Sequence, residues 1–156
     1  MTRWVIIFLL FEMNLVAQTN LKSVFSVCVN DMDGVVFTKE YDQILDINKV
    51  YERITPTVQQ LNDAEEILKK SWTIAGFNKR FYAKAKRQYA GYLTETGEAV
   101  IVINLFYFKK KARAKKNFSG WDHDYFLGSV DFFERYYRHY NVNLNTKTVP
   151  LGEVIN

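Results

Sequence analysis

A chain of 156 residues with 48% apolar and 16% aromatic side chains is long enough to bury a core and too apolar to remain disordered. Its formal net charge is +4, and its one cysteine, Cys28, excludes an internal disulfide. A cysteine-based zinc site is excluded as well, because such a site needs several thiolates or imidazoles, and the chain holds only two histidines.

The N-terminal segment has the pattern of an export signal. Residues 5–11 form a short apolar run that follows a basic residue and precedes Ala17, and the run is shorter than the ~20 residues of a membrane-spanning helix. Glu12 interrupts it, so a buried first element of a cytoplasmic protein is the alternative. We expect residues 1–18 to be a signal peptide, whose cleavage the sequence leaves open, and residues 19–156 to form one periplasmic or secreted domain.

An apolar segment at residues 24–29 leads into Asp31, Asp33 and Gly34. This pattern resembles the first motif of HAD-type phosphatases, which implies Asp31 as the nucleophile and Asp33 as a general acid/base beside a magnesium ion. That family's other motifs are missing, including the Ser or Thr that ends its second strand. We therefore interpret Asp33-Gly34 as the turn pair of a β-hairpin and keep a magnesium-dependent phosphohydrolase as an alternative. Cys28 is expected to be a buried thiol.

A helix is predicted over residues 57–70. Pro56 precedes Thr57, and Gln60 follows three residues later, which is a capping-box pattern. Apolar side chains then recur at helical spacing at Val58, Leu61, Ala64, Ile67 and Leu68. This apolar stripe predicts a helix that packs on a sheet.

A β-hairpin is predicted next, with strands at residues 89–93 and 99–108. Gly97 suits the positive φ of a tight turn. The second strand is almost continuously apolar, which predicts a central strand covered on both faces. Asn104 within it needs a hydrogen-bond partner if it is buried.

A basic segment at residues 109–116 is the candidate binding patch for an anionic partner, either a polymer or a lipid. Its basic residues are Lys109, Lys110, Lys111, Arg113, Lys115 and Lys116. The alternative is a solvated loop beyond a strand end. If the protein is exported, nucleic acid is not the expected partner, and no disulfide-linked partner is expected.

Asp122, His123 and Asp124 offer a third polar cluster. Neighbouring residues of an extended chain point to opposite faces, and a metal ion needs three or four converging ligands. We therefore expect a polar loop and no metal site or cofactor. Residues 125–144 fit either a helix or a strand, because their aromatic side chains suit both. Pro150 restricts the last segment to a sheet edge.

Several phrases resemble a group of small exported proteins of Bacteroidota that have no assigned activity. The phrases lie within residues 53–150 and are Thr55-Pro56-Thr57 with the helix that follows, Arg87-Gln88-Tyr89 with Gly91-Tyr92, and Val102-Ile103-Asn104. The resemblance implies one helix against an antiparallel sheet and favours a strand over residues 129–144. It implies no functional residue.

Together these patterns predict an α+β fold, in which one main helix packs on an antiparallel sheet of four or five strands. The function that they favour is a non-enzymatic accessory or binding protein of the cell envelope, because no second catalytic motif accompanies Asp31 and Asp33. The phosphohydrolase and the binder of anionic polymers or lipids remain the two alternatives.

Overall fold

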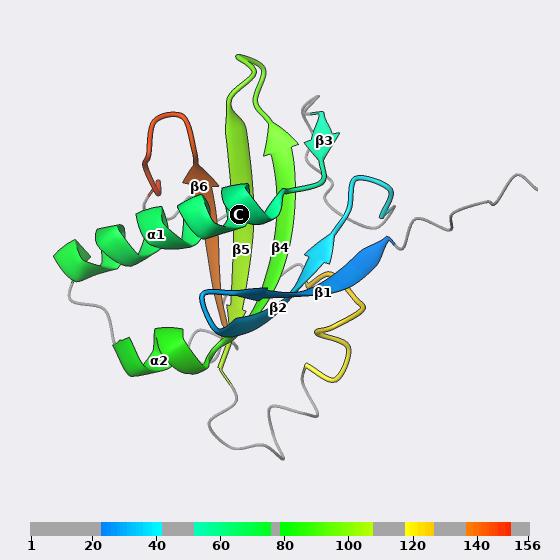
Figure 1. Cartoon of the computed structure of the whole chain (residues 1–156), viewed down its shortest axis with the longest axis vertical. Coiled ribbons are helices and arrows are strands. Elements are labelled where there is room, and N and C mark those ends of the chain that lie inside the picture. The colour runs from blue at the N-terminus through cyan, green and yellow to red at the C-terminus, as the bar shows by residue number, and fades with distance from the viewer. Residues whose placement is uncertain (1–22, 42–51, 76–78, 108–117, 127–136, 151–156) are drawn as a thin grey trace, which may run out of the picture.

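The computed structural model describes residues 23–41, 52–75, 79–107, 118–126 and 137–150. The elements in chain order are β1 (Val24–Val29), β2 (Met32–Phe37), β3 (Arg53–Ile54), α1 (Val58–Ala75), α2 (Lys79–Lys84), β4 (Lys86–Leu93), β5 (Ala99–Phe106) and β6 (Tyr137–Asn143). The strands form one sheet in the order β1-β2-β4-β5-β6, and β3 also pairs with β4 (Figure 1).

The predicted α+β architecture, with one main helix on a largely antiparallel sheet, is confirmed. Among the described residues, five strands lie along the main path of the sheet, and the two-residue strand β3 adds a sixth at the edge of β4, beside Gly91 and Tyr92. One pairing in the described chain, between β2 and β4, is parallel, whereas the others are antiparallel. A parallel pair needs a long crossover connection, and here the connection contains α1 and α2.

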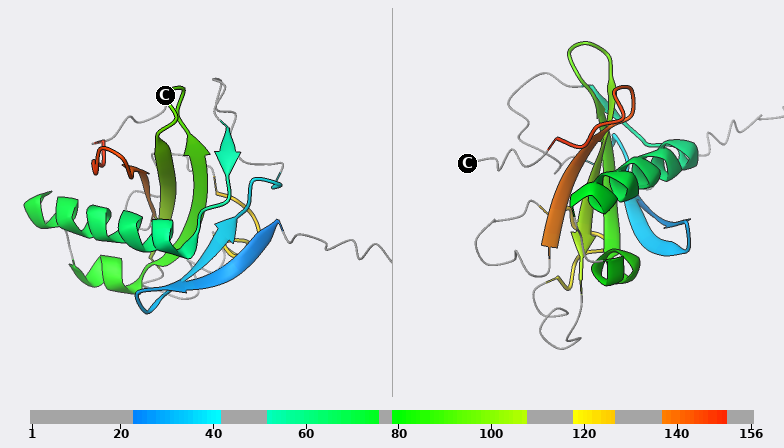
Figure 2. Two further views of the ribbon diagram at one scale, coloured as in Figure 1. Left: turned by 45° about the horizontal axis from the view of Figure 1, so that its top comes forward. Right: turned by 90° about the vertical axis from the view of Figure 1, so that its left-hand side faces the viewer.

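Helix α1 begins where its sequence predicts. Thr57 N donates to Gln60 Oε1 (2.9 Å), and Gln60 N donates to Thr57 Oγ1 (3.2 Å), so both halves of the capping box are formed. The helix continues to Ala75, five residues beyond the predicted end. Figure 2 shows α1 lying across one side of the sheet.

The sheet therefore has two faces, which we call the helix face and the loop face. On the helix face, α1 contributes Leu61, Ala64 and Leu68 to a core shared with alternate residues of the strands. On the loop face, residues 118–126 cover a second apolar group centred on Val35, Phe37, Ala90 and Val102. Strand β5 is buried from Val100 to Phe106, as expected for a central strand that is covered on both faces.

The turn between β1 and β2 differs from the prediction. Asn30 and Asp31, with φ of 49° and 62°, form the two-residue turn, and Val29 pairs with Met32. Asp33 and Gly34 belong to strand β2. Glycine is required at position 34 because a Cβ there would lie 2.7 Å from Tyr89 Cε2, so Gly34 permits close packing and does not make the turn.

Cys28 is exposed on β1, so the predicted burial of its thiol is wrong. Residues 125–144 were compatible with either a helix or a strand, and the described part of them, residues 137–143, forms strand β6. Residues 127–136 lie outside the described chain. The predicted signal peptide at residues 1–18 and the basic segment at residues 109–116 lie outside it as well. The predicted turns after β4 and β6 are present, with φ of 80° at Gly97 and 56° at Lys147.

Candidate functional site

Asp31 and Asp33 lie on the β1–β2 hairpin and not at the end of a strand in a parallel sheet. Asp31 is exposed in the turn, and Asp33 is exposed on β2 with an ion pair to Lys86. This hydrogen-bonded cation lowers the pKa of Asp33. The geometry therefore gives Asp33 a surface ion pair and gives no support to a phosphoryl-transfer site at Asp31.

The Asp122, His123 and Asp124 cluster forms an exposed polar loop, as predicted. His123 Nδ1 lies 2.9 Å from Asp122 Oδ1, and His123 Nε2 lies 3.5 Å from Asp124 Oδ2. Both ring nitrogens thus face carboxylates of the same loop. Across the residues that the structure describes, no group of three or more His, Cys, Asp or Glu side chains could hold a metal ion.

The loop that carries this cluster is fastened to the sheet by a buried amide. Gln88 Nε2 donates to the carbonyl oxygens of Trp121 and Asp124, and Phe126 N donates to Gln88 Oε1 (3.0 Å). Three backbone groups of the loop are thereby satisfied by one side chain of β4. Because a buried amide without partners is costly, Gln88 fixes the position of residues 121–126.

A second buried amide, Asn104, extends this network toward β6. Its Nδ2 donates to Gln88 Oε1 (3.3 Å) and to Phe126 O (3.0 Å), which leaves Oδ1 to accept. Tyr137 OH and His139 Nδ1 each lie 2.8 Å from that oxygen, so His139 carries its proton on Nδ1. Desolvation lowers the pKa of His139, which favours the neutral form of its ring. The prediction that a buried Asn104 needs a partner is confirmed.

Beside this network, partly exposed aromatic side chains gather on the loop face. We call them the aromatic face, which consists of Tyr41, Tyr92, Trp121 and Tyr125. They pack over Phe37, whose ring makes edge-to-face contacts with Tyr41 (4.8 Å between centroids) and Tyr125 (5.2 Å).

Hydrogen bonds hold the aromatic face in place from separate segments of the chain. Tyr41 OH donates to His123 O (3.4 Å), and Tyr125 N donates to Tyr41 OH (3.3 Å). Arg53 binds the carbonyl oxygens of Tyr41 and Thr38, and Lys86 Nζ lies 5.9 Å from the ring centroid of Trp121. The aromatic face is therefore preorganised, with charged side chains beside it.

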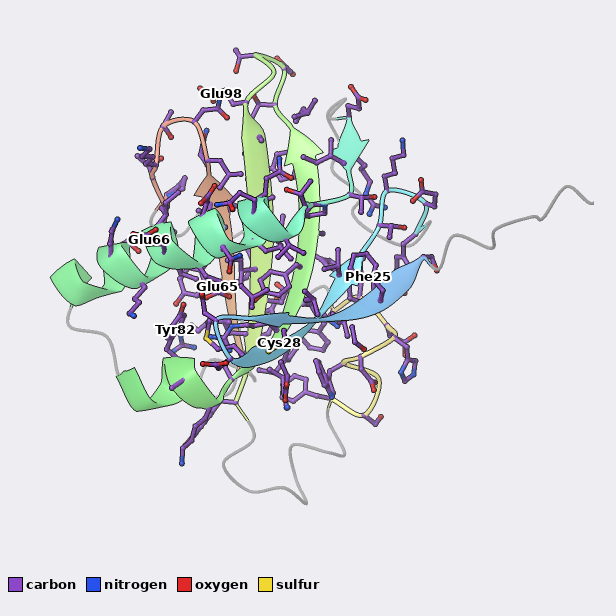
Figure 3. All side chains as sticks on the ribbon, in the orientation of Figure 1. Phe25, Cys28, Glu65, Glu66, Tyr82 and Glu98 are labelled. Carbon is purple, nitrogen blue, oxygen red and sulfur yellow. The ribbon has the colours of Figure 1, made fainter. Side chains whose placement is uncertain are left out.

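On the helix face, the structure places a buried ion pair that the sequence analysis did not find. Glu65 and Arg87 have no exposed side-chain surface, and Arg87 Nε donates to Glu65 Oε1 at 2.8 Å. Tyr89 OH donates to the same oxygen (2.7 Å), and Tyr82 OH donates to Glu65 Oε2. Figure 3 shows Glu65 on α1 and Tyr82 on α2, so the carboxylate joins both helices to the sheet.

Both terminal nitrogens of Arg87 also have partners within the protein. Its Nη1 donates to Ala85 O, and its Nη2 donates to Tyr82 O (3.0 Å) and to Met32 Sδ. A guanidinium with all its partners inside the protein is not free to bind a substrate. The sequence did contain one signal for this pair: Glu65 falls on the apolar stripe of α1, four residues after Leu61 and three before Leu68.

Comparisons with known proteins return no match: no family model, no curated protein and no solved structure is similar to this chain. In the described part of the chain, no helix has both the length and the apolar character needed to cross a membrane. The basic segment at residues 109–116 lies outside the described residues and stays a prediction.

Proposed function

We propose that the protein is a non-enzymatic, exported binding protein of the cell envelope, and that its ligand binds at the aromatic face. The observation that carries this proposal is the contrast between the two faces of the sheet. On the helix face, the buried ionisable groups are satisfied by one another. On the loop face, aromatic side chains from separate segments are held rigidly and remain partly exposed.

Partly exposed tyrosine and tryptophan side chains are typical of binding surfaces, because they supply a large contact area at a small cost in conformational entropy. Here hydrogen bonds hold the hydroxyl group of Tyr41 and the backbones of Trp121 and Tyr125, and the rings of Tyr41 and Tyr125 pack edge-to-face on Phe37 before a ligand arrives. Preorganisation of this kind lowers the entropic cost of binding. Lys86, whose Nζ lies 5.9 Å from the ring centroid of Trp121, supplies a charge that would orient a polar ligand.

The binding test uses washed envelope particles of the producing cell as the probe. Purified full chain is mixed with the particles, and the fraction of protein that sediments with them is measured. Trp121→Ala removes the largest ring of the aromatic face while leaving the backbone oxygen that binds Gln88. Glu66→Ala, on the exposed side of α1, is the matched control, and circular dichroism verifies that both variants are folded.

We expect wild type and Glu66→Ala to sediment equally and Trp121→Ala to remain largely in solution. Equal sedimentation of all three proteins would place the binding surface elsewhere, and no sedimentation of any would remove the binding proposal. Fractionation of cells producing the full chain tests export separately, because a purely cytoplasmic protein contradicts the envelope assignment.

The non-enzymatic part of the proposal has its own test. Hydrolysis of 4-nitrophenyl phosphate is measured with magnesium at high protein concentration, for wild type and Asp31→Asn. We expect no protein-dependent hydrolysis. Activity that is present in wild type and lost in Asp31→Asn would favour the phosphohydrolase instead.

A further inference from the structure

Strand β1 is an edge of the sheet, and its outward-facing backbone groups can be identified from its register. Thr38 N donates to Ser23 O (2.9 Å), and the two-residue turn closes at the Val29–Met32 pair. Hydrogen-bonded and non-hydrogen-bonded pairs alternate in an antiparallel ladder. The N–H and C=O groups of the alternate residues Val24, Ser26 and Cys28 therefore point away from β2, and within the described chain no hydrogen bond reaches them.

The composition of β1 does not protect this edge. Exposed edge strands are usually protected by charged residues, by proline or by a bulge, whereas the sequence of β1, VFSVCV, has no charge, no proline and no glycine. The opposite edge, β6, carries Arg138, His139 and two asparagines, and Thr148 folds back onto its last residue. Of the two edges, β1 is the one suited to pair with another strand.

We propose that β1 pairs antiparallel with β1 of a second copy of this chain, which forms a two-fold symmetric dimer with a continuous sheet. The outward-facing residues are symmetric about Ser26. A two-fold axis at Ser26 places the Ser26 residues of the two copies opposite each other. It also places Val24 of each copy opposite Cys28 of the other. All the outward N–H and C=O groups of the two strands then form hydrogen bonds. A shift of the axis by one residue toward the turn would place Val24 opposite Asn30, whose φ of 49° takes it out of the strand.

The side chains of β1 support the same register. On the helix face, Phe25 comes to lie opposite Val27 of the second copy, and both residues are half-buried in the monomer. Aromatic and β-branched side chains that face one another across a ladder stabilise it. Because β1 is uncharged, two identical strands meet without repulsion, which favours a second copy as the occupant of the edge. Figure 3 labels Phe25 and Cys28 on this strand.

The first experiment tests the register with the full chain. In the Ser26→Cys/Cys28→Ser variant, the two cysteines are a directly opposed pair with Cα atoms about 5.5 Å apart, which suits a disulfide. In wild type, the two Cys28 residues are offset by four residues, or about 14 Å along the strand, which is too far for one. Glu95→Cys/Cys28→Ser, with its cysteine exposed in the β4–β5 turn, is the control for random collision.

Under mild oxidation, we expect a disulfide-linked dimer from the Ser26→Cys variant and little from wild type or the Glu95→Cys control. Equal cross-linking of all three proteins would reject this register.

The second experiment measures molar mass by light scattering after size-exclusion chromatography. Ser26→Pro removes an outward N–H without removing a hydrogen bond to β2, so we expect it to be monomeric, whereas wild type and Ser26→Thr are dimeric. A monomeric wild type overturns the proposal, even if the edge then binds an extended peptide of another protein. A Ser26→Pro variant that stays dimeric overturns it as well, because the interface then lies elsewhere.

Discussion

Replacing Arg87 by methionine leaves the carboxylate of Glu65 buried without its cation. Glu65 has no exposed surface and keeps only the hydroxyl groups of Tyr82 and Tyr89 as donors. Removal of one member of a buried ion pair costs about 3–5 kcal/mol, because the other charge stays in a medium of low dielectric constant. We therefore expect Arg87→Met to lower the free energy of unfolding by about 3–5 kcal/mol.

Removal of the whole polar group at once should have the opposite outcome. A buried ion pair replaced by apolar side chains of similar volume is often neutral or stabilising. In the Glu65→Leu/Arg87→Met/Tyr89→Phe variant, no charge remains, and the fully buried hydroxyl of Tyr89 is removed with its acceptor. Tyr82 is half-buried, so its hydroxyl group can turn to water. We expect this triple variant to unfold within about 1 kcal/mol of wild type.

Urea unfolding followed by circular dichroism measures these free energies, provided that the transitions are two-state and the m values agree. A triple variant that is as unstable as Arg87→Met would show that packing, not the orphaned charge, accounts for the loss.

Three further predictions follow from residues near this pair. Gly34→Ala should lower the free energy of unfolding by about 1–3 kcal/mol in the same urea assay, since the new Cβ meets the ring of Tyr89 at 2.7 Å; a neutral substitution would contradict the close packing. Burial and the charge of Glu65 raise the pKa values of Tyr82 and Tyr89, so stability should be constant up to about pH 10 and fall above it. Absorbance at alkaline pH should show these phenols ionising only as the protein unfolds, and normal titration in the folded state would refute this. The depressed pKa of Asp33 should return toward its ordinary value in Lys86→Met, as followed by NMR, and because the pair is largely exposed its loss should cost less than about 1 kcal/mol at neutral pH.

The features that the sequence predicted correctly depend on local interactions. The capping box of Thr57 and Gln60 spans three residues, and both of its hydrogen bonds are formed. The continuous apolar run of β5 predicted burial on both faces of the sheet, and this prediction did not depend on which segments provide the cover. Gly97 adopts positive φ at the turn where its sequence context places it.

The features that the sequence did not predict depend on distant partners. Asp33-Gly34 is a strong local turn signal, but the packing of Tyr89 against Gly34 moves the turn to Asn30 and Asp31, which also tolerate positive φ. Gln88 fastens a loop more than thirty residues away, and nothing near it in the sequence indicates that loop. The candidate site could not be predicted for the same reason, because the aromatic face is assembled from three separate segments: the chain after β2, strand β4 and the loop of residues 118–126.

The parallel pairing of β2 with β4 also has a consequence for the dynamics of the molecule. It is a short seam, with Gly34–Val36 beside residues 87–89, that joins the β1–β2 hairpin to the antiparallel unit of β4, β5 and β6. The hairpins β1–β2 and β4–β5 can form through local contacts. The seam closes only after the chain has passed through α1 and α2, and its partners are farther apart in the sequence than those of β5 and β6, which makes it the late step in folding. We expect native-state hydrogen exchange to show that the amides between β2 and β4 exchange through a separate local opening. In that opening the β1–β2 hairpin leaves the sheet, while the amides of β5 stay protected.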